Sequence, residues 1–83
     1  MSEIKKILEN RQETYGDAEP NLKKIGRIWA SLLGLPGDIP AYQVALMMDS
    51  FKTVRCFANP EHEDSWDDKL GYIHHAREIV LGK

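Results

Sequence analysis

The chain has 83 residues, of which 42% are hydrophobic and 29% charged, and its formal net charge at pH 7 is −2. This length excludes a second independent core, and this composition excludes a disordered or membrane-spanning protein. A pI near 5.9 without a basic block argues against binding to duplex nucleic acid, and the single Cys56 excludes an intrachain disulfide. We therefore expect one cytoplasmic domain over residues 1–83.

The first half of the chain predicts two helices. Apolar residues recur with helical spacing from Ser2 to Tyr15, and Ser2 suits the N-cap of that helix. Pro20 suits the first turn of a second helix, because the missing N–H of proline is not needed there. Gly34 is expected to end this second helix as its C-terminal cap. The predicted apolar face of the second helix consists of Leu22, Ile25, Ile28, Trp29, Leu32 and Leu33.

The second half of the chain predicts two more helices. A loop rich in Gly and Pro covers residues 34–40, and Pro40 suits the start of a helix over residues 41–58. Cys56 lies among apolar residues of this third helix and is expected to be a small core residue. Asp64 or Ser65 is expected to cap a fourth helix that runs up to Gly82. The expected buried stripe of the fourth helix is Trp66, Leu70, Ile73, Arg77 and Val80.

The third predicted helix has more apolar surface than one other helix of the chain can cover. Because a small monomer would expose the remainder, we predict an all-α bundle of about four helices that forms a homo-oligomer. The apolar residues of this helix with a 3.6-residue period are Val44, Met47, Met48, Phe51, Val54 and Ala58, and Tyr42, Leu46 and Cys56 widen the surface.

Three cations could bind an anionic ligand. Arg11 lies on the apolar stripe of the first helix, where its charge requires either an anion or access to water. Lys52 and Arg55 are three residues apart on the third helix and therefore lie side by side. Arginine offers two parallel donors and lysine a compact charge, which suits a phosphate group. Aromatic side chains offer stacking surfaces in addition to these cations. The candidate ligand-binding residues are therefore Arg11, Tyr15, Lys52, Arg55, Trp66, Asp68 and Tyr72.

An acidic cluster surrounds Trp66 at the start of the fourth predicted helix. Carboxylates are favoured in the first turn of a helix, so capping and ion pairing explain this cluster without a metal. Asp64 and Asp68 are one turn apart and can face the same partner, which is either Lys52 with Arg55 or a divalent cation such as Mg²⁺. We expect ion pairing. The cluster comprises Glu61, Glu63, Asp64, Asp67 and Asp68.

The histidines and the familiar catalytic motifs give no further site. His74 and His75 are adjacent and point about 100° apart on a helix, unlike the i,i+4 pair that holds zinc in helical sites. A structural zinc site is therefore not expected. The sequence has no Gly-rich phosphate loop, no G-x-S-x-G and no Cys-x-x-Cys, so it contains no complete catalytic motif, which leans against an enzyme without excluding one. No cofactor is expected, except Mg²⁺ if the protein is an enzyme.

One combination of residues resembles a known family. Lys52-x-x-Arg55 is followed by Asp64-x-Trp66-x-Asp68-x-x-Gly71-Tyr72 and preceded by Arg11-x-x-x-Tyr15-Gly16-Asp17 and Asn21. This order resembles a family of small helical proteins encoded by phages and prophages, over nearly the whole chain. The resemblance implies a role during phage infection, in the cytoplasm of a bacterial host. It implies no particular activity.

A more distant likeness is to the all-helical nucleotide pyrophosphohydrolases of the MazG type, which bind Mg²⁺ through acidic helix motifs. Asp64 and Asp68 look like half of such a site. Those enzymes have a Glu-x-x-Glu motif on an earlier helix, whereas Glu9 and Glu13 of this chain are four residues apart. This difference counts against metal-dependent hydrolysis, but it is compatible with a nucleotide-sized pocket between helices.

These observations leave three functional hypotheses. The leading one is a non-enzymatic phage protein that binds a nucleotide-like small molecule bearing phosphate, and sequesters it as a host immune signal. The second is a Mg²⁺-dependent nucleotide pyrophosphohydrolase of the MazG type, in which Asp64 and Asp68 hold the metal against a triphosphate. The third is an inhibitor that docks an apolar helix face on a host enzyme.

Overall fold

The structure, a computed structural model, describes residues 18–82, and these residues form three helices and no strand. The helices are α2 (Ala18–Leu33), α3 (Ala41–Ala58) and α4 (Glu63–Leu81). The predicted all-α class is confirmed. The helix predicted over residues 2–15 lies outside the described residues, as do Arg11 and Tyr15, so the described part shows three of the four expected helices.

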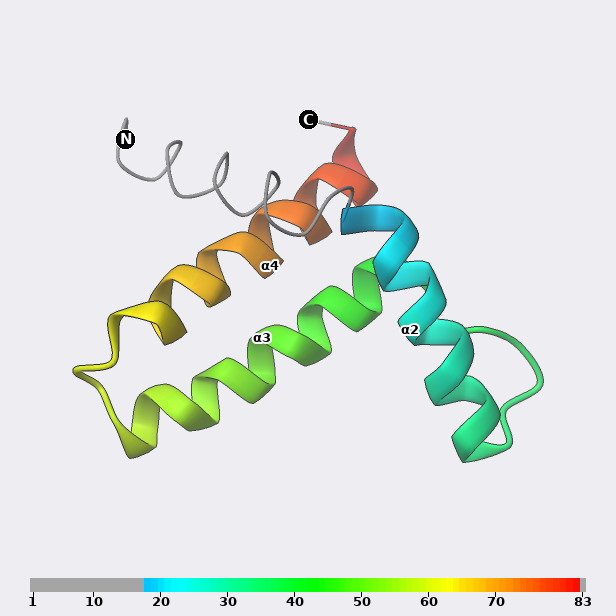
Figure 1. Cartoon of the computed structure of the whole chain (residues 1–83). Helices are drawn as coiled ribbons and strands as arrows, with labels where there is room; N and C mark the ends of the chain where they lie inside the picture. Colours follow the sequence, from blue (N-terminus) through cyan, green and yellow to red (C-terminus); the bar gives the residue numbers. More distant parts are fainter. Residues whose placement is uncertain (1–17, 83) are drawn as a thin grey trace.

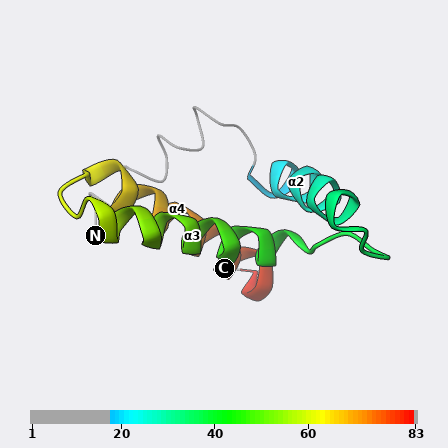
Figure 2. The ribbon, with the colours of Figure 1, turned by 90° about the horizontal axis from the view of Figure 1, so that it is seen from below.

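The helices α3 and α4 form an antiparallel pair joined by a short turn, and they contact each other more extensively than any other pair (Figure 1). Helix α2 crosses the end of this pair where α3 begins and α4 ends, and it packs mainly on α3. The view from below shows α2 standing beside the two-helix layer rather than within it (Figure 2). The described part is therefore a helical hairpin with a third helix across one end.

The boundaries of α2 and α3 follow the proline and glycine signals. Helix α2 begins at Ala18, two residues before Pro20, which lies in the first turn as proline tolerates. At its end Gly34 adopts a positive φ of 69°, and the N–H of Leu35 donates to the carbonyl of Ala30 at 2.9 Å. This is a Schellman motif, which confirms the predicted glycine cap. Helix α3 has the predicted bounds, with Pro40 as its N-cap.

The start of α4 differs from the sequence prediction. We expected Asp64 or Ser65 as the N-cap, but His62 occupies that position. Ser65 is instead 2% exposed, faces inward, and its hydroxyl lies 3.0 Å from His62 Nδ1. Asp64 is in the first turn, where the helix dipole still favours a carboxylate. The C-terminal end is as expected, because Gly82 takes the left-handed conformation with φ 72°.

The core lies where the three described helices meet and is built largely from small side chains. Val44 of α3 is completely buried, and the other buried members of this cluster are Leu22, Ala41, Ala45 and Ala76. Ile25, Trp29, Met48 and Ile79 pack partly buried around it. Cys56 is 7% exposed and lies inside α3, which confirms its predicted role as a small buried residue.

Helix α2 and the loop that follows it are in very close contact at Gly26. The backbone N–H of Ile39 donates to the Gly26 carbonyl at 3.3 Å. A Cβ atom on Gly26 would overlap the Ile39 carbonyl oxygen and would lie 3.2 Å from Val44 Cγ2. Glycine is therefore required at this position by the approach of the backbone and not by its own φ angle.

The predicted buried stripe of α4 is wrong. Trp66, Leu70, Ile73 and Val80 are all exposed, whereas the inward face of α4 carries Ser65 and Ala76 together with half-buried polar residues. Small side chains allow two helices to approach closely, and the polar side chains beside them find partners on α3. The apolar stripe is consequently left on the outside of the described structure.

Parts of the predicted faces of α2 and α3 are exposed as well. On α2, Leu22 is buried and Ile25 and Trp29 are partly buried, but Ile28, Leu32 and Leu33 are exposed. On α3 the exposed residues of the predicted face are Leu46, Met47, Phe51, Val54 and Ala58, and Phe57, which was not part of the prediction, is exposed too. Apolar surface of this extent is uncommon on a monomer and is typical of an interaction surface. Across residues 18–82, no helix is long and apolar enough to cross a membrane.

Candidate functional site

Two ion pairs cross the contact between α3 and α4. The ammonium of Lys52 lies 2.9 Å from the Asp68 carboxylate, and that of Lys69 lies 2.7 Å from the Asp49 carboxylate. Lys69 also donates to the hydroxyl of Thr53 at 2.6 Å. The four charged side chains are between 18 and 23% exposed. Because these ion pairs are largely shielded from water, loss of one partner would leave the other charge poorly solvated and would weaken the contact between α3 and α4.

The sequence singled out two members of this network. Lys52 and Asp68 were expected to lie together, and the structure brings them together as an ion pair across the two helices. Asp64, one turn before Asp68, is exposed and is not part of the pair. Tyr72 is half-buried on α4. The sequence prediction missed Asp49 and Lys69. Each of the two helices carries one aspartate and one lysine close together, and this pattern could have indicated two ion pairs between the helices.

Arg55 has different surroundings from its neighbour Lys52. Its side chain is exposed, and among residues 18–82 its guanidinium forms no ion pair with Asp64, Asp68 or another carboxylate. The guanidinium carbon lies 6.0 Å from the centre of the exposed Phe51 ring, and Lys52 Nζ lies 5.5 Å from the same centre. Both distances allow a cation–π contact. The two cations and the ring form one surface patch, which we call the Phe51 patch.

Trp66 is not a core residue, contrary to the expectation from its position on the apolar stripe. It is 48% exposed, and its indole N–H donates to the Pro60 carbonyl at 2.9 Å. The side chain therefore ties the turn between α3 and α4 to the first turn of α4. The ring remains accessible on the outer surface.

We expect Trp66→Phe to lower the free energy of unfolding by about 0.5–1.5 kcal/mol, the net contribution of one hydrogen bond. This is less than the loss of about 3–5 kcal/mol typical of removing a buried tryptophan. Urea unfolding of the two proteins measures the difference. A loss above about 3 kcal/mol would mean that the ring is buried in solution.

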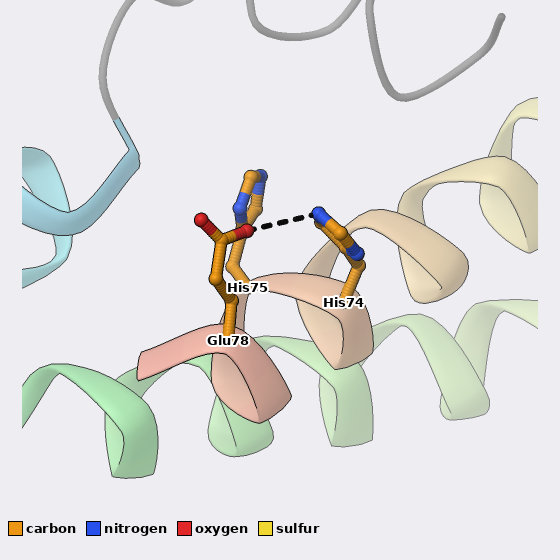
Figure 3. A group of neighbouring side chains, drawn as sticks. All are labelled: His74, His75 and Glu78. Carbon is orange, nitrogen blue, oxygen red and sulfur yellow. Dashed lines mark ion pairs between the residues drawn. The ribbon is translucent and has the colours of Figure 1, made fainter. Parts of the chain in front are cut away.

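A second group of polar side chains lies on the C-terminal half of α4. Figure 3 shows His74, His75 and Glu78 converging at one point on the helix surface, with the Glu78 carboxylate next to both imidazoles. His74 Nε2 lies 3.1 Å from Glu78 Oε2, and one nitrogen or oxygen atom of each residue lies within 4.8 Å of the others. The two rings are 5.4 Å apart and meet edge to face.

The three side chains meet because Glu78 lies three residues after one histidine and four after the other. Both spacings place side chains next to each other on a helix. The angle between the two adjacent histidines did not predict this group, because Glu78 is the residue that brings the three side chains together. Burial lowers the pKa of His75, the neighbouring His74 lowers it further, and Glu78 acts in the opposite direction. His75 is therefore neutral over a wider pH range than an exposed histidine.

Comparison with known proteins identifies a family without assigning a function. No curated protein and no solved structure matches the chain. A family described as a domain of unknown function, DUF6378, matches residues 1–80. This match covers nearly the whole chain, the same extent as the resemblance to a small helical family of unknown activity. The chain therefore belongs to DUF6378.

Proposed function

We propose that the protein functions as a homo-oligomer, in which the exposed apolar stripe of α4 packs against the same stripe of a second copy. The observation that supports this proposal is the exposure of Trp66, Leu70, Ile73 and Val80 on one face of one helix. With Arg77 included, these positions follow alternating steps of four and three residues. Such spacing is typical of helices that pair along their length.

The charges on α4 favour an antiparallel arrangement of the two copies. The N-terminal part of α4 is acidic, with Glu63, Asp64 and Asp67, whereas in the C-terminal part Glu78 offsets the charge of Arg77. Antiparallel pairing keeps the two acidic parts at opposite ends of the interface, whereas parallel pairing places them side by side, where like charges repel. A two-fold arrangement also uses the same surface on both copies, which is the commonest symmetry of soluble oligomers.

Sedimentation velocity over a range of concentrations tests this proposal. We expect a dimer or a higher oligomer that dissociates on dilution. A monomer at all concentrations would reject self-association, and it would favour the third hypothesis, in which the apolar face docks on a host protein.

The Phe51 patch supports a second candidate function, binding of a nucleotide-like small molecule that bears phosphate. Arg55 has no carboxylate partner among the described residues, so its two parallel donors are available to a phosphate. The exposed Phe51 ring beside it offers a stacking surface for a base. Sequestration of such a molecule during phage infection of a bacterium is the role that we propose for this binding.

We expect Arg55→Gln to weaken nucleotide binding by about 1.5–3 kcal/mol, the contribution of a charged hydrogen bond, and to change stability by less than about 0.5 kcal/mol. A thermal-shift panel of mono-, cyclic and dinucleotides identifies the ligand, and titration of both proteins measures the difference. Lys52→Gln is the contrasting variant, because it removes the partner of Asp68 and should lower stability. A panel without any response, or unchanged affinity in Arg55→Gln, would reject the candidate.

A MazG-type hydrolase is less well supported. Asp68 would have to leave its ion pair with Lys52 in order to bind Mg²⁺ together with Asp64. Release of pyrophosphate from a nucleoside triphosphate in the presence of Mg²⁺ would nevertheless establish this activity.

A further inference from the structure

We propose that His74, His75 and Glu78 form a binding site for a transition-metal ion of the Zn²⁺ type. The proposal rests on the convergence of three ligand atoms, one from each side chain, within 4.8 Å of one another (Figure 3). All three residues belong to one helix, so the site does not depend on self-association. It is also separate from the Phe51 patch, which is built on α3.

The geometry requires only small movements of the side chains. In a tetrahedral site with Zn–N distances of 2.0–2.1 Å, neighbouring ligand atoms are about 3.3 Å apart. His74 Nε2 and Glu78 Oε2 are already 3.1 Å apart. The imidazole of His75, which is half-buried, has to approach this pair by rotation about its own side-chain bonds, and its nearest ligand atom is already within 4.8 Å of the other two.

The donor set selects the class of metal. Two imidazole nitrogens and one carboxylate oxygen suit Zn²⁺, Ni²⁺, Co²⁺ or Cu²⁺, whereas Mg²⁺ and Ca²⁺ prefer oxygen ligands alone. Two histidines and a glutamate leave a coordination position open for water or an anionic group. This site therefore differs in chemistry and in position from the Mg²⁺ pair that Asp64 and Asp68 were considered to form.

The site is accessible from solvent. The side chains of His74 and Glu78 are 42% and 58% exposed, so an ion reaches them without opening the fold. For the same reason, substitutions at these positions are expected to leave the core intact, and their effects on metal binding can be separated from unfolding.

Calorimetric titration of the full chain with Zn²⁺ tests the proposal. The protein should carry no polyhistidine tag and should first be freed of metal with a chelator. We expect one Zn²⁺ per chain, a rise in melting temperature on binding, and a visible absorption band when Co²⁺ replaces Zn²⁺. Excess Mg²⁺ should not compete. A titration without saturable binding, or displacement of Zn²⁺ by Mg²⁺, would overturn the proposal.

Single substitutions locate the ion. His74→Ala, His75→Ala and Glu78→Gln should each weaken Zn²⁺ binding by at least about 10-fold, since even outer partners of metal ligands contribute 10- to 100-fold. His62→Asn is the matched control, because His62 lies outside the group and asparagine is a good N-cap residue. Equal losses in His62→Asn and His74→Ala would show unspecific binding to histidines and would also overturn the proposal.

Discussion

Replacing Gly26 with alanine should destabilise the protein by about 1–3 kcal/mol, the usual cost of forcing an extra group into a packed site. In an exposed helix interior the same substitution stabilises by about 1 kcal/mol, so the sign of the effect reports the contact with the loop. The added methyl group would overlap the Ile39 carbonyl oxygen, which belongs to the backbone and cannot rotate away. Either α2 or the loop has to move. Thermal and urea unfolding measure the change.

Gly71→Ala is the matched control for this prediction. Gly71 also lies within a helix, but a Cβ atom built there meets no atom within 4 Å apart from the adjacent residues and backbone of its own helix. Alanine should therefore raise the free energy of unfolding through its higher helix propensity, by up to about 1 kcal/mol. Equal stability of Gly26→Ala and wild type would show that the loop does not approach α2 as described.

The double variant Leu70→Gln, Ile73→Gln should convert the oligomer to a monomer. Leu70 is 41% exposed and Ile73 44% exposed on the outer stripe of α4, and neither belongs to the buried core, so the monomer should still fold. In a two-fold interface they remove four apolar side chains, and burial of one such side chain contributes about 1.5–3 kcal/mol. We expect the dissociation constant to rise by at least about 100-fold. Sedimentation velocity measures the change, and circular dichroism should report an unchanged helix content.

Leu32→Gln, Leu33→Gln is the matched control on another helix. These residues of α2 are also large, apolar and exposed, but they lie outside the α4 stripe. The control variant should remain an oligomer. Dissociation of the α2 variant combined with an intact α4 variant would assign the interface to α2 and would reject the antiparallel arrangement.

The candidate sites could be predicted from the sequence only in part. That Lys52 and Arg55 lie side by side follows from their spacing on one helix. The pairing of Lys52 with Asp68 follows from the opposite charges on adjacent helices. That Arg55 would contact Phe51 instead of an acidic residue depends on side-chain directions, which the sequence leaves open. The convergence of His74 with Glu78 was available from their i,i+4 spacing alone.

The sequence by itself determined the three described helices and most of their ends. Prolines that cannot donate, and glycines that accept a positive φ, act within a few residues, so the end of α2, both ends of α3 and the end of α4 follow from local chemistry. Only the tertiary structure decided which face of each helix is buried. Helix α4 turns Ser65 and Ala76 inward and leaves Trp66 and Leu70 outside, because close approach and two ion pairs with α3 select its small and polar face. The choice of the buried face depends on the helix that packs against α4, and the pattern of apolar residues within α4 carries no information about that helix.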